Sequence, residues 1–130
     1  MDDDLLTAAV EIADTASRLA AQRFLEGAPA QTKADGSPVT TADVEVEAVV
    51  RSLIAARFPD DGVAGEELAE TPGTTGRRWI IDPINGTAAF ARRVPMFNVL
   101  LTVEDAEGGA AAVTGLPSAL AWTGAPSRKR

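Results

Sequence analysis

Acidic residues gather in two short segments of the sequence, Gly65-Glu66-Glu67 and Asp82-Pro83-Ile84-Asn85-Gly86-Thr87. Each segment follows a short apolar stretch that predicts a buried strand, and adjacent strands would bring the two acidic ends together. Carboxylates held that close repel one another unless a cation neutralises them. Because the chain has no histidine and no cysteine, its ligand atoms are oxygens, which indicates a hard ion such as Mg²⁺, Mn²⁺ or Ca²⁺.

Each of these signals also has an ordinary structural explanation. A pair such as Glu66-Glu67 is usually a solvated part of a loop, Asn85-Gly86 is a common turn, and Asp43 is most simply a residue that starts a helix. Taken one at a time the signals are weak, so the prediction of a site depends on their occurring together.

The composition of the 130-residue chain excludes several classes of function. A net charge of −7 argues against a main role in binding nucleic acid or an anionic membrane, but it permits a phosphorylated substrate held through metal ions. The lack of histidine and cysteine removes Ser-His-Asp catalysis, thiolate catalysis and most zinc sites. The acidic start is unlike a secretory signal and no apolar run is long enough to span a bilayer, so we expect a cytoplasmic protein.

Two helices are expected to position the acidic segments. Apolar residues at alternating steps of four and three predict a first helix from about Asp3 to Leu25. A loop follows over residues 28–39. A second helix begins near Thr40, which resembles one half of a capping pair with Asp43, and it ends before Pro59.

The rest of the chain reads as strands and then loses its pattern. Short apolar stretches predict four strands, over residues 61–65, 78–81 and 97–103 and from residue 110 onward. Helices followed by strands indicate a layered α+β fold. The apolar pattern stops after Thr114, so we expect a domain over residues 1–113 and a divergent, disordered tail over residues 114–130.

Three motifs together resemble the inositol monophosphatase family. The segment 79–87 reads W-I-I-D-P-I-N-G-T and looks like the family's W-I-I-D-P-I-D-G-T, residues 65–67 are similar to its G-E-E, and residues 38–43 resemble its P-V-T-x-x-D. The motifs occur in the family's order and the likeness covers about Leu5 to Val113. It implies a sugar-phosphatase-like fold, with two N-terminal helices on a largely antiparallel sheet, truncated to its N-terminal half.

The resemblance also implies a metal site. Glu66 would bind a metal and help position the attacking water, and Asp82 would bridge two metals. Ile84 would contribute its backbone carbonyl, and Asn85 occupies the position of a further metal ligand. Glu67 matches the second glutamate of its motif without a clear role. The implied cofactor is Mg²⁺.

Catalytic and phosphate-binding roles follow from the same resemblance. Asp43 and Thr87 would together activate the water that attacks phosphorus, and Gly86 and Thr87 would offer backbone N–H groups to the phosphate. Lys33 and Asp35 would lie on a loop at the edge of the site. The implied reaction is metal-assisted hydrolysis of a small phosphorylated metabolite of the inositol monophosphate or histidinol phosphate type.

The sequence departs from the family in two ways. Asn85 stands where the family has Asp, which removes a negative charge and should weaken binding of a second Mg²⁺. The chain also stops at about half the family's usual length. We expect this to leave one face of the sheet uncovered, with self-association or a homodimer as the consequence.

Three functions therefore remain open at this stage. The chain is a working Mg²⁺-dependent phosphatase, a catalytically inactive remnant because of Asn85 and the missing half, or an interaction module that uses the uncovered sheet face. Whether it is an active enzyme is left undecided by the sequence.

Overall fold

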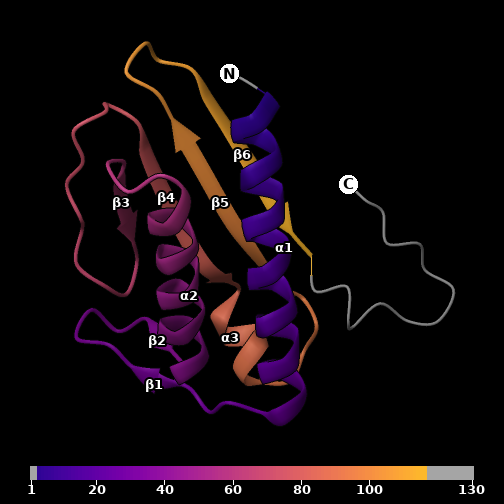
Figure 1. The fold of residues 1–130 in the computed structure, drawn as a ribbon. Coiled ribbons are helices and arrows are strands. Elements are labelled where there is room, and N and C mark those ends of the chain that lie inside the picture. Colours follow the sequence, from indigo (N-terminus) through magenta and orange to yellow (C-terminus); the bar gives the residue numbers. More distant parts are fainter. Residues whose placement is uncertain (1–2, 117–130) are drawn as a thin grey trace, which may run out of the picture.

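A four-stranded sheet forms the centre of the molecule, and two long helices lie against one of its faces (Figure 1). The computed structural model describes residues 3–116. The sheet order is β3-β4-β5-β6, with β3 (Gly62–Gly65) parallel to β4 (Arg78–Asn85). β5 (Asn98–Glu104) is antiparallel to both β4 and β6 (Ala110–Gly115). The expected largely antiparallel α+β architecture is confirmed.

Small side chains let the first helix, α1 (Asp3–Glu26), lie close to the sheet. Its buried stripe is mostly alanine, which keeps the distance between helix and sheet short. On β6, a Cβ atom at Gly115 would lie 2.7 Å from the Ala13 carbonyl oxygen, so only glycine fits there. The helix ends at Glu26, one residue later than predicted. Gly27 follows it, and its positive φ of +86° suits a C-terminal cap.

The second helix, α2 (Thr41–Arg57), begins at a capping box. The Asp43 amide donates to the Thr40 hydroxyl and the Asp43 carboxylate accepts from the Thr40 amide, as the sequence predicted. The apolar face of α2 packs over β4, where Trp79 and Ile81 are almost fully buried. A core between helices and sheet thus holds the strands that carry the acidic segments.

Strand β4 continues further than the sequence predicted. We expected a strand over residues 78–81 that gives way to the motif at Asp82, but Asp82 is paired with β5 and the pairing resumes at Asn85 after a register shift. The shift adds one residue on β4, and the successive residues Pro83 and Ile84 are both buried whereas Asp82 is half-buried. The motif is therefore an irregular strand end rather than a turn that follows a strand.

Two short features were not predicted. The expected loop over residues 28–39 contains a small hairpin of β1 (Gln31–Thr32) and β2 (Pro38–Val39), and a short helix, α3 (Thr87–Ala91), follows the motif. Figure 1 shows both at one end of the molecule, where α3 contacts β2. Neither has an apolar period long enough to be recognised in a sequence.

The C-terminal boundary remains a prediction. β6 extends to Gly115, two residues past the expected boundary, and the predicted tail lies mostly outside the described residues. Among residues 3–116, no helix has both the length and the apolar character to cross a bilayer.

Candidate metal and phosphate site

The carboxylates of Glu66 and Asp82 meet at the ends of two parallel strands. Gly65 lies opposite Ile81 in the β3–β4 register, so Glu66, which follows the last residue of β3, comes beside Asp82, which is still within β4. The two side chains are close enough for Glu66 to affect the protonation of Asp82. Burial raises the pKa of Asp82 to about 6, and the adjacent Glu66 charge and the charges of Asp43 and Glu67 act in the same direction.

A second polar group joins α2 to the motif. The Thr87 hydroxyl lies 2.9 Å from Asp43 Oδ1 and 3.0 Å from the Ile84 carbonyl oxygen, and it can donate its proton to either. Asp43 is buried and its other oxygen, Oδ2, accepts from the Thr40 amide and hydroxyl at 2.8 and 2.6 Å. Asp43 thus both caps its helix and holds Thr87, so the ordinary and the functional explanations of this residue apply together.

Gly86 shapes the start of α3. Its φ is +107°, and a Cβ atom there would lie 2.8 Å from the Met96 carbonyl oxygen, so a larger residue would be both strained and crowded. This close approach to the segment before β5 directs Thr87 back toward Asp43.

Asn85 lies outside the contacts just described. It is exposed and faces Asn98 across the β4–β5 pair. Within the described residues, the buried Asn98 Oδ1 atom has no hydrogen-bond partner. No signal in the sequence pointed to Asn98, because its position opposite Asn85 follows from the register shift.

The second glutamate of the pair has a different environment from the first. The Glu67 side chain is only 7% exposed and forms an ion pair with Lys33 at 3.0 Å. Asp35 accepts hydrogen bonds from the Ser37 amide and hydroxyl, which hold its pKa below the usual value. Lys33 therefore contacts the acidic segment directly, whereas Asp35 is occupied within the β1–β2 turn.

Sequence reasoning missed Glu47, a residue of α2 whose carboxylate contacts the turn that follows Glu66. This residue is fully buried and accepts hydrogen bonds from the amides of Glu67 and Leu68. A signal was present: Asp43, Glu47 and Arg51 recur at steps of four, so they share one face of α2 beside its apolar stripe.

The donor set fits a hard cation in its chemistry. Within residues 3–116 no group of three or more Asp or Glu side chains is arranged to hold a metal ion. Two adjacent carboxylates do meet, and Mg²⁺ is commonly bound by one or two carboxylates, with waters and substrate phosphate completing its shell. Burial and the neighbouring carboxylates both raise the pKa of Asp82, and a bound cation would oppose both effects.

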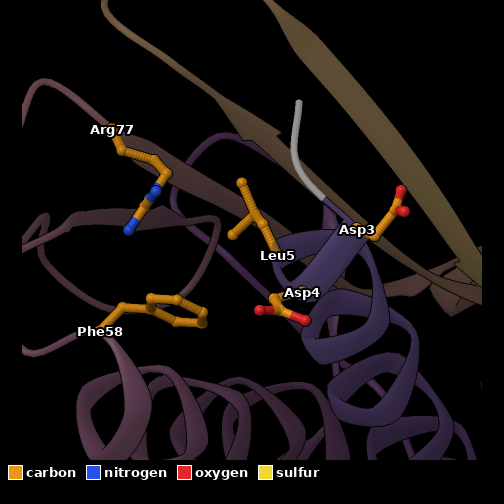
Figure 2. A pocket seen from close by; sticks show the side chains of 5 residues that line it. All are labelled: Asp3, Asp4, Leu5, Phe58 and Arg77. Atoms are coloured by element: carbon orange, nitrogen blue, oxygen red, sulfur yellow. The ribbon is translucent and has the colours of Figure 1, made fainter.

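An open hollow of about 330 Å³ lies at the opposite end of the molecule, near the start of α1 (Figure 2). Its lining comprises Asp3, Asp4, Leu5, Phe58 and Arg77. Arg77 precedes β4 and Phe58 follows α2, whereas the acidic pair lies where β4 ends and α2 begins. This hollow contains none of the predicted site residues.

Comparisons with known proteins agree with the motifs. The profile of the inositol monophosphatase family matches residues 1–128. A histidinol-phosphatase of Chlorobaculum parvum is 44% identical over 100 residues, which are 76% of this chain and 39% of that protein. A histidinol-phosphatase of Mycobacterium tuberculosis is 43% identical over 106 residues, which are 79% of this chain and 40% of that protein.

Solved structures show the same fold. An IMPase of Thermotoga maritima superposes with a TM-score of 0.78 at 25% identity, covering 89% of this chain and 45% of the other. An IMPase/NADP phosphatase, solved with NADP and Ca²⁺, gives a TM-score of 0.71 at 21% identity, covering 88% of this chain and 44% of the other. The chain thus spans about two fifths of the length of the curated relatives it matches. A family profile along nearly the whole sequence and relatives above 40% identity lead to one conclusion: the chain belongs to the inositol monophosphatase family.

Proposed function

We propose that this chain carries the metal- and phosphate-binding part of a Mg²⁺-dependent phosphatase acting on a small phosphate monoester. The observation that carries the proposal is the β3–β4 register, which brings Glu66 beside Asp82, near the Asp43–Thr87 pair. The names of the relatives favour histidinol phosphate as substrate, with inositol monophosphate as the second choice.

Glu66, Asp82 and the Ile84 carbonyl would hold the ion. When bound, Mg²⁺ would lower the pKa of a water and offset the negative charge of the phosphate. Mg²⁺ fits because the pair supplies two carboxylates, and this ion usually completes its shell with waters and substrate phosphate oxygens. Asn85 supplies one neutral oxygen, so we expect a second ion to bind weakly.

Asp43 and Thr87 would prepare the attacking water. When Thr87 donates its proton to Asp43 Oδ1, the threonine oxygen keeps a lone pair that can accept a hydrogen bond from water. The proton of that water passes to Thr87 as the threonine proton passes to Asp43. Thr40 fixes Asp43 through the other carboxylate oxygen, so the acceptor does not rotate away.

Other residues would bind or border the phosphate. The backbone N–H groups of Gly86 and Thr87 would donate to its oxygens, with Gly86 permitting the necessary turn. The Lys33–Glu67 ion pair would hold the β1–β2 hairpin at the edge of the site. Asp35 would act only on the shape of that hairpin turn.

An inactive binding module is the second candidate. The observation that favours it is the neutral, exposed Asn85 at a position where the family's motif has Asp. Self-association is a related proposal, since α1 and α2 lie on one face of the sheet and leave Ile80 and Leu100 only half-buried on the other. A cytoplasmic location likewise stays a prediction.

The test is release of inorganic phosphate from histidinol phosphate and inositol 1-phosphate, with and without Mg²⁺. The wild-type chain is compared with Asp82→Asn, which removes the central carboxylate, and with Asn85→Asp, which restores the family residue. Mg²⁺-dependent release by the wild type that Asp82→Asn abolishes would support the proposal. Release only by Asn85→Asp would favour the inactive module, and release by none would reject phosphatase activity for this chain.

A further inference from the structure

A fully buried carboxylate lies under the turn that carries Glu66. Glu47 is 0% exposed, and its Oε1 atom accepts a hydrogen bond from the Glu67 amide at 2.9 Å. Its Oε2 atom accepts from the Leu68 amide at 3.0 Å and from Arg51 Nε at 3.0 Å. Charge-assisted bonds of this kind are among the strongest in proteins, so the turn is fixed from below.

The space occupied by this carboxylate explains the glycine of the motif. A Cβ atom at Gly65 would lie between 2.3 and 2.5 Å from the Glu47 carboxylate atoms. Real Cβ contacts are essentially never that short, so a side chain at Gly65 would have to displace a carboxylate that is held by the Glu67 and Leu68 amides. Gly65 and Glu47 therefore act together, because the absence of a side chain at Gly65 leaves space for the carboxylate that accepts from the Glu67 and Leu68 amides.

Arg51 and Lys33 complete the clamp around the turn. Arg51 donates to the Leu68 carbonyl at 3.1 Å and to the Thr71 hydroxyl at 3.2 Å. Lys33 binds the Glu67 carboxylate. These contacts restrain both the backbone after Glu66 and the side chain of Glu67, and they leave the Glu66 carboxylate to meet Asp82.

We propose that Glu47 is a positioning residue, which sets the Glu66 carboxylate beside Asp82 and thereby determines how tightly the pair binds a divalent cation. The inference rests on the proposed function, because it assigns the pair a metal. Outer residues that orient metal ligands typically change metal affinity by about 10-fold to 100-fold when mutated. A merely structural Glu47 would instead change stability and leave affinity unaltered.

The experiment measures binding of Mn²⁺, a hard and paramagnetic substitute for Mg²⁺, to the full chain by electron paramagnetic resonance of the free ion. Glu47→Gln keeps the size of the side chain but removes its charge and one acceptor oxygen. Val50→Ala is the matched control, because Val50 is equally buried on α2 and contacts the core rather than the turn. Thermal unfolding of each variant reports the loss of stability separately.

We expect Glu47→Gln to weaken Mn²⁺ binding by about 10-fold or more, and Val50→Ala to lower the melting temperature with affinity within about twofold of wild type. Equal affinities for Glu47→Gln and wild type would overturn the inference while leaving the proposed function intact. Failure of the wild type to bind Mn²⁺ would reject the metal site itself, and the inference with it.

A second variant keeps the test decisive if Glu47→Gln does not fold. Gly65→Ala pushes against the Glu47 carboxylate from the other side of the contact. We expect it to weaken Mn²⁺ binding in the same way, and wild-type affinity in a folded Gly65→Ala chain would contradict the proposed coupling.

Discussion

Asp61 and Asp82 lie at opposite ends of the same pair of parallel strands, and their surroundings differ. Asp61 is 3% exposed and accepts hydrogen bonds from Arg77 at 2.7 Å, Thr75 at 2.7 Å and the Trp79 indole at 2.8 Å. Burial alone would raise the pKa of Asp61, but these donors outweigh it and hold the pKa below its usual value. Burial, together with the neighbouring Glu66 carboxylate, instead raises the pKa of Asp82 to about 6.

The difference separates a carboxylate held by hydrogen-bond donors of the protein from one that lies beside a second carboxylate and that we propose takes part in chemistry. The donors that lower the pKa of Asp61 are all side chains of the protein, so the negative charge of Asp61 stabilises the folded state. Asp82 and Glu66 lie beside each other, and the nearby Lys33 ammonium is paired with Glu67, so we propose that a bound cation would stabilise the acidic pair. The predictions below test this contrast, beginning with the largest effect.

Truncating Asp61 should cause the largest loss of stability. Asp61→Ala leaves the Trp79 N–H without its acceptor and Arg77 without its ion pair, so we expect the free energy of unfolding to fall by about 3 kcal/mol. Urea unfolding measures this loss. The exposed neighbour variant Asp60→Ala should change stability by no more than about 0.5 kcal/mol, and equal losses in the two variants would contradict the assignment.

Metal binding should stabilise the chain through the other carboxylate. Mg²⁺ at about 100 times its dissociation constant should add about 2.7 kcal/mol to the free energy of unfolding, and a chelator should reverse the gain. The gain should vanish in Asp82→Asn, which loses one of the two adjacent carboxylates. An unchanged rise of the melting temperature in this variant would place the ion elsewhere.

Acid should selectively remove the contribution of Asp61. Because its folded-state pKa is depressed, its stabilisation is present above the unfolded value of 3.8 and is lost as pH falls through the lower folded value. The loss should be smaller than in Asp61→Ala, since a protonated carboxyl still accepts hydrogen bonds. Urea unfolding at pH values from about 7 down to about 3 measures this effect. The difference in the free energy of unfolding between wild type and Asp61→Ala should become smaller as the pH falls. A difference that does not change with pH would contradict the assigned role of Asp61.

Removing the Thr87 hydroxyl should have the smallest effect on stability. Thr87→Val leaves the buried Asp43 Oδ1 without its hydroxyl donor, which should cost about 1 kcal/mol. Thr87→Ser keeps the hydroxyl and should retain most of that stability. Thermal unfolding of the pair measures the difference. If phosphate release is detected in the wild type, it should be lost in Thr87→Val and retained in Thr87→Ser.

Much of the fold was predictable because its signals are local. The predicted first helix from Asp3 to Leu25 differs from α1 by one residue, since a long apolar period defines it. The capping box at Thr40 and Asp43 also follows from neighbouring residues. The β1–β2 hairpin and α3 were missed, because two-residue strands and a five-residue helix depend on contacts with the rest of the chain.

The sequence predicted which residue types form the candidate site but not which side chains contact one another. The motifs placed Glu66 and Glu67 together, whereas the structure separates them, with Glu66 beside Asp82 and Glu67 paired with Lys33. Glu47 was absent from the prediction, because on a helix it read as one more charged residue. The roles of these residues in metal binding and catalysis stay predictions.

The sequence by itself determined the family, the order of helices and strands, and a chemistry restricted to oxygen ligands, because composition, periodicity and motifs are written in consecutive residues. Only the tertiary structure decided which carboxylates meet. The β3–β4 register brings Glu66 to Asp82, the shift after Asp82 sets Asn85 opposite Asn98, and the buried Glu47 fixes the turn between the strands. These are contacts between residues distant in the chain, and their geometry exists only once the helices have packed on the sheet.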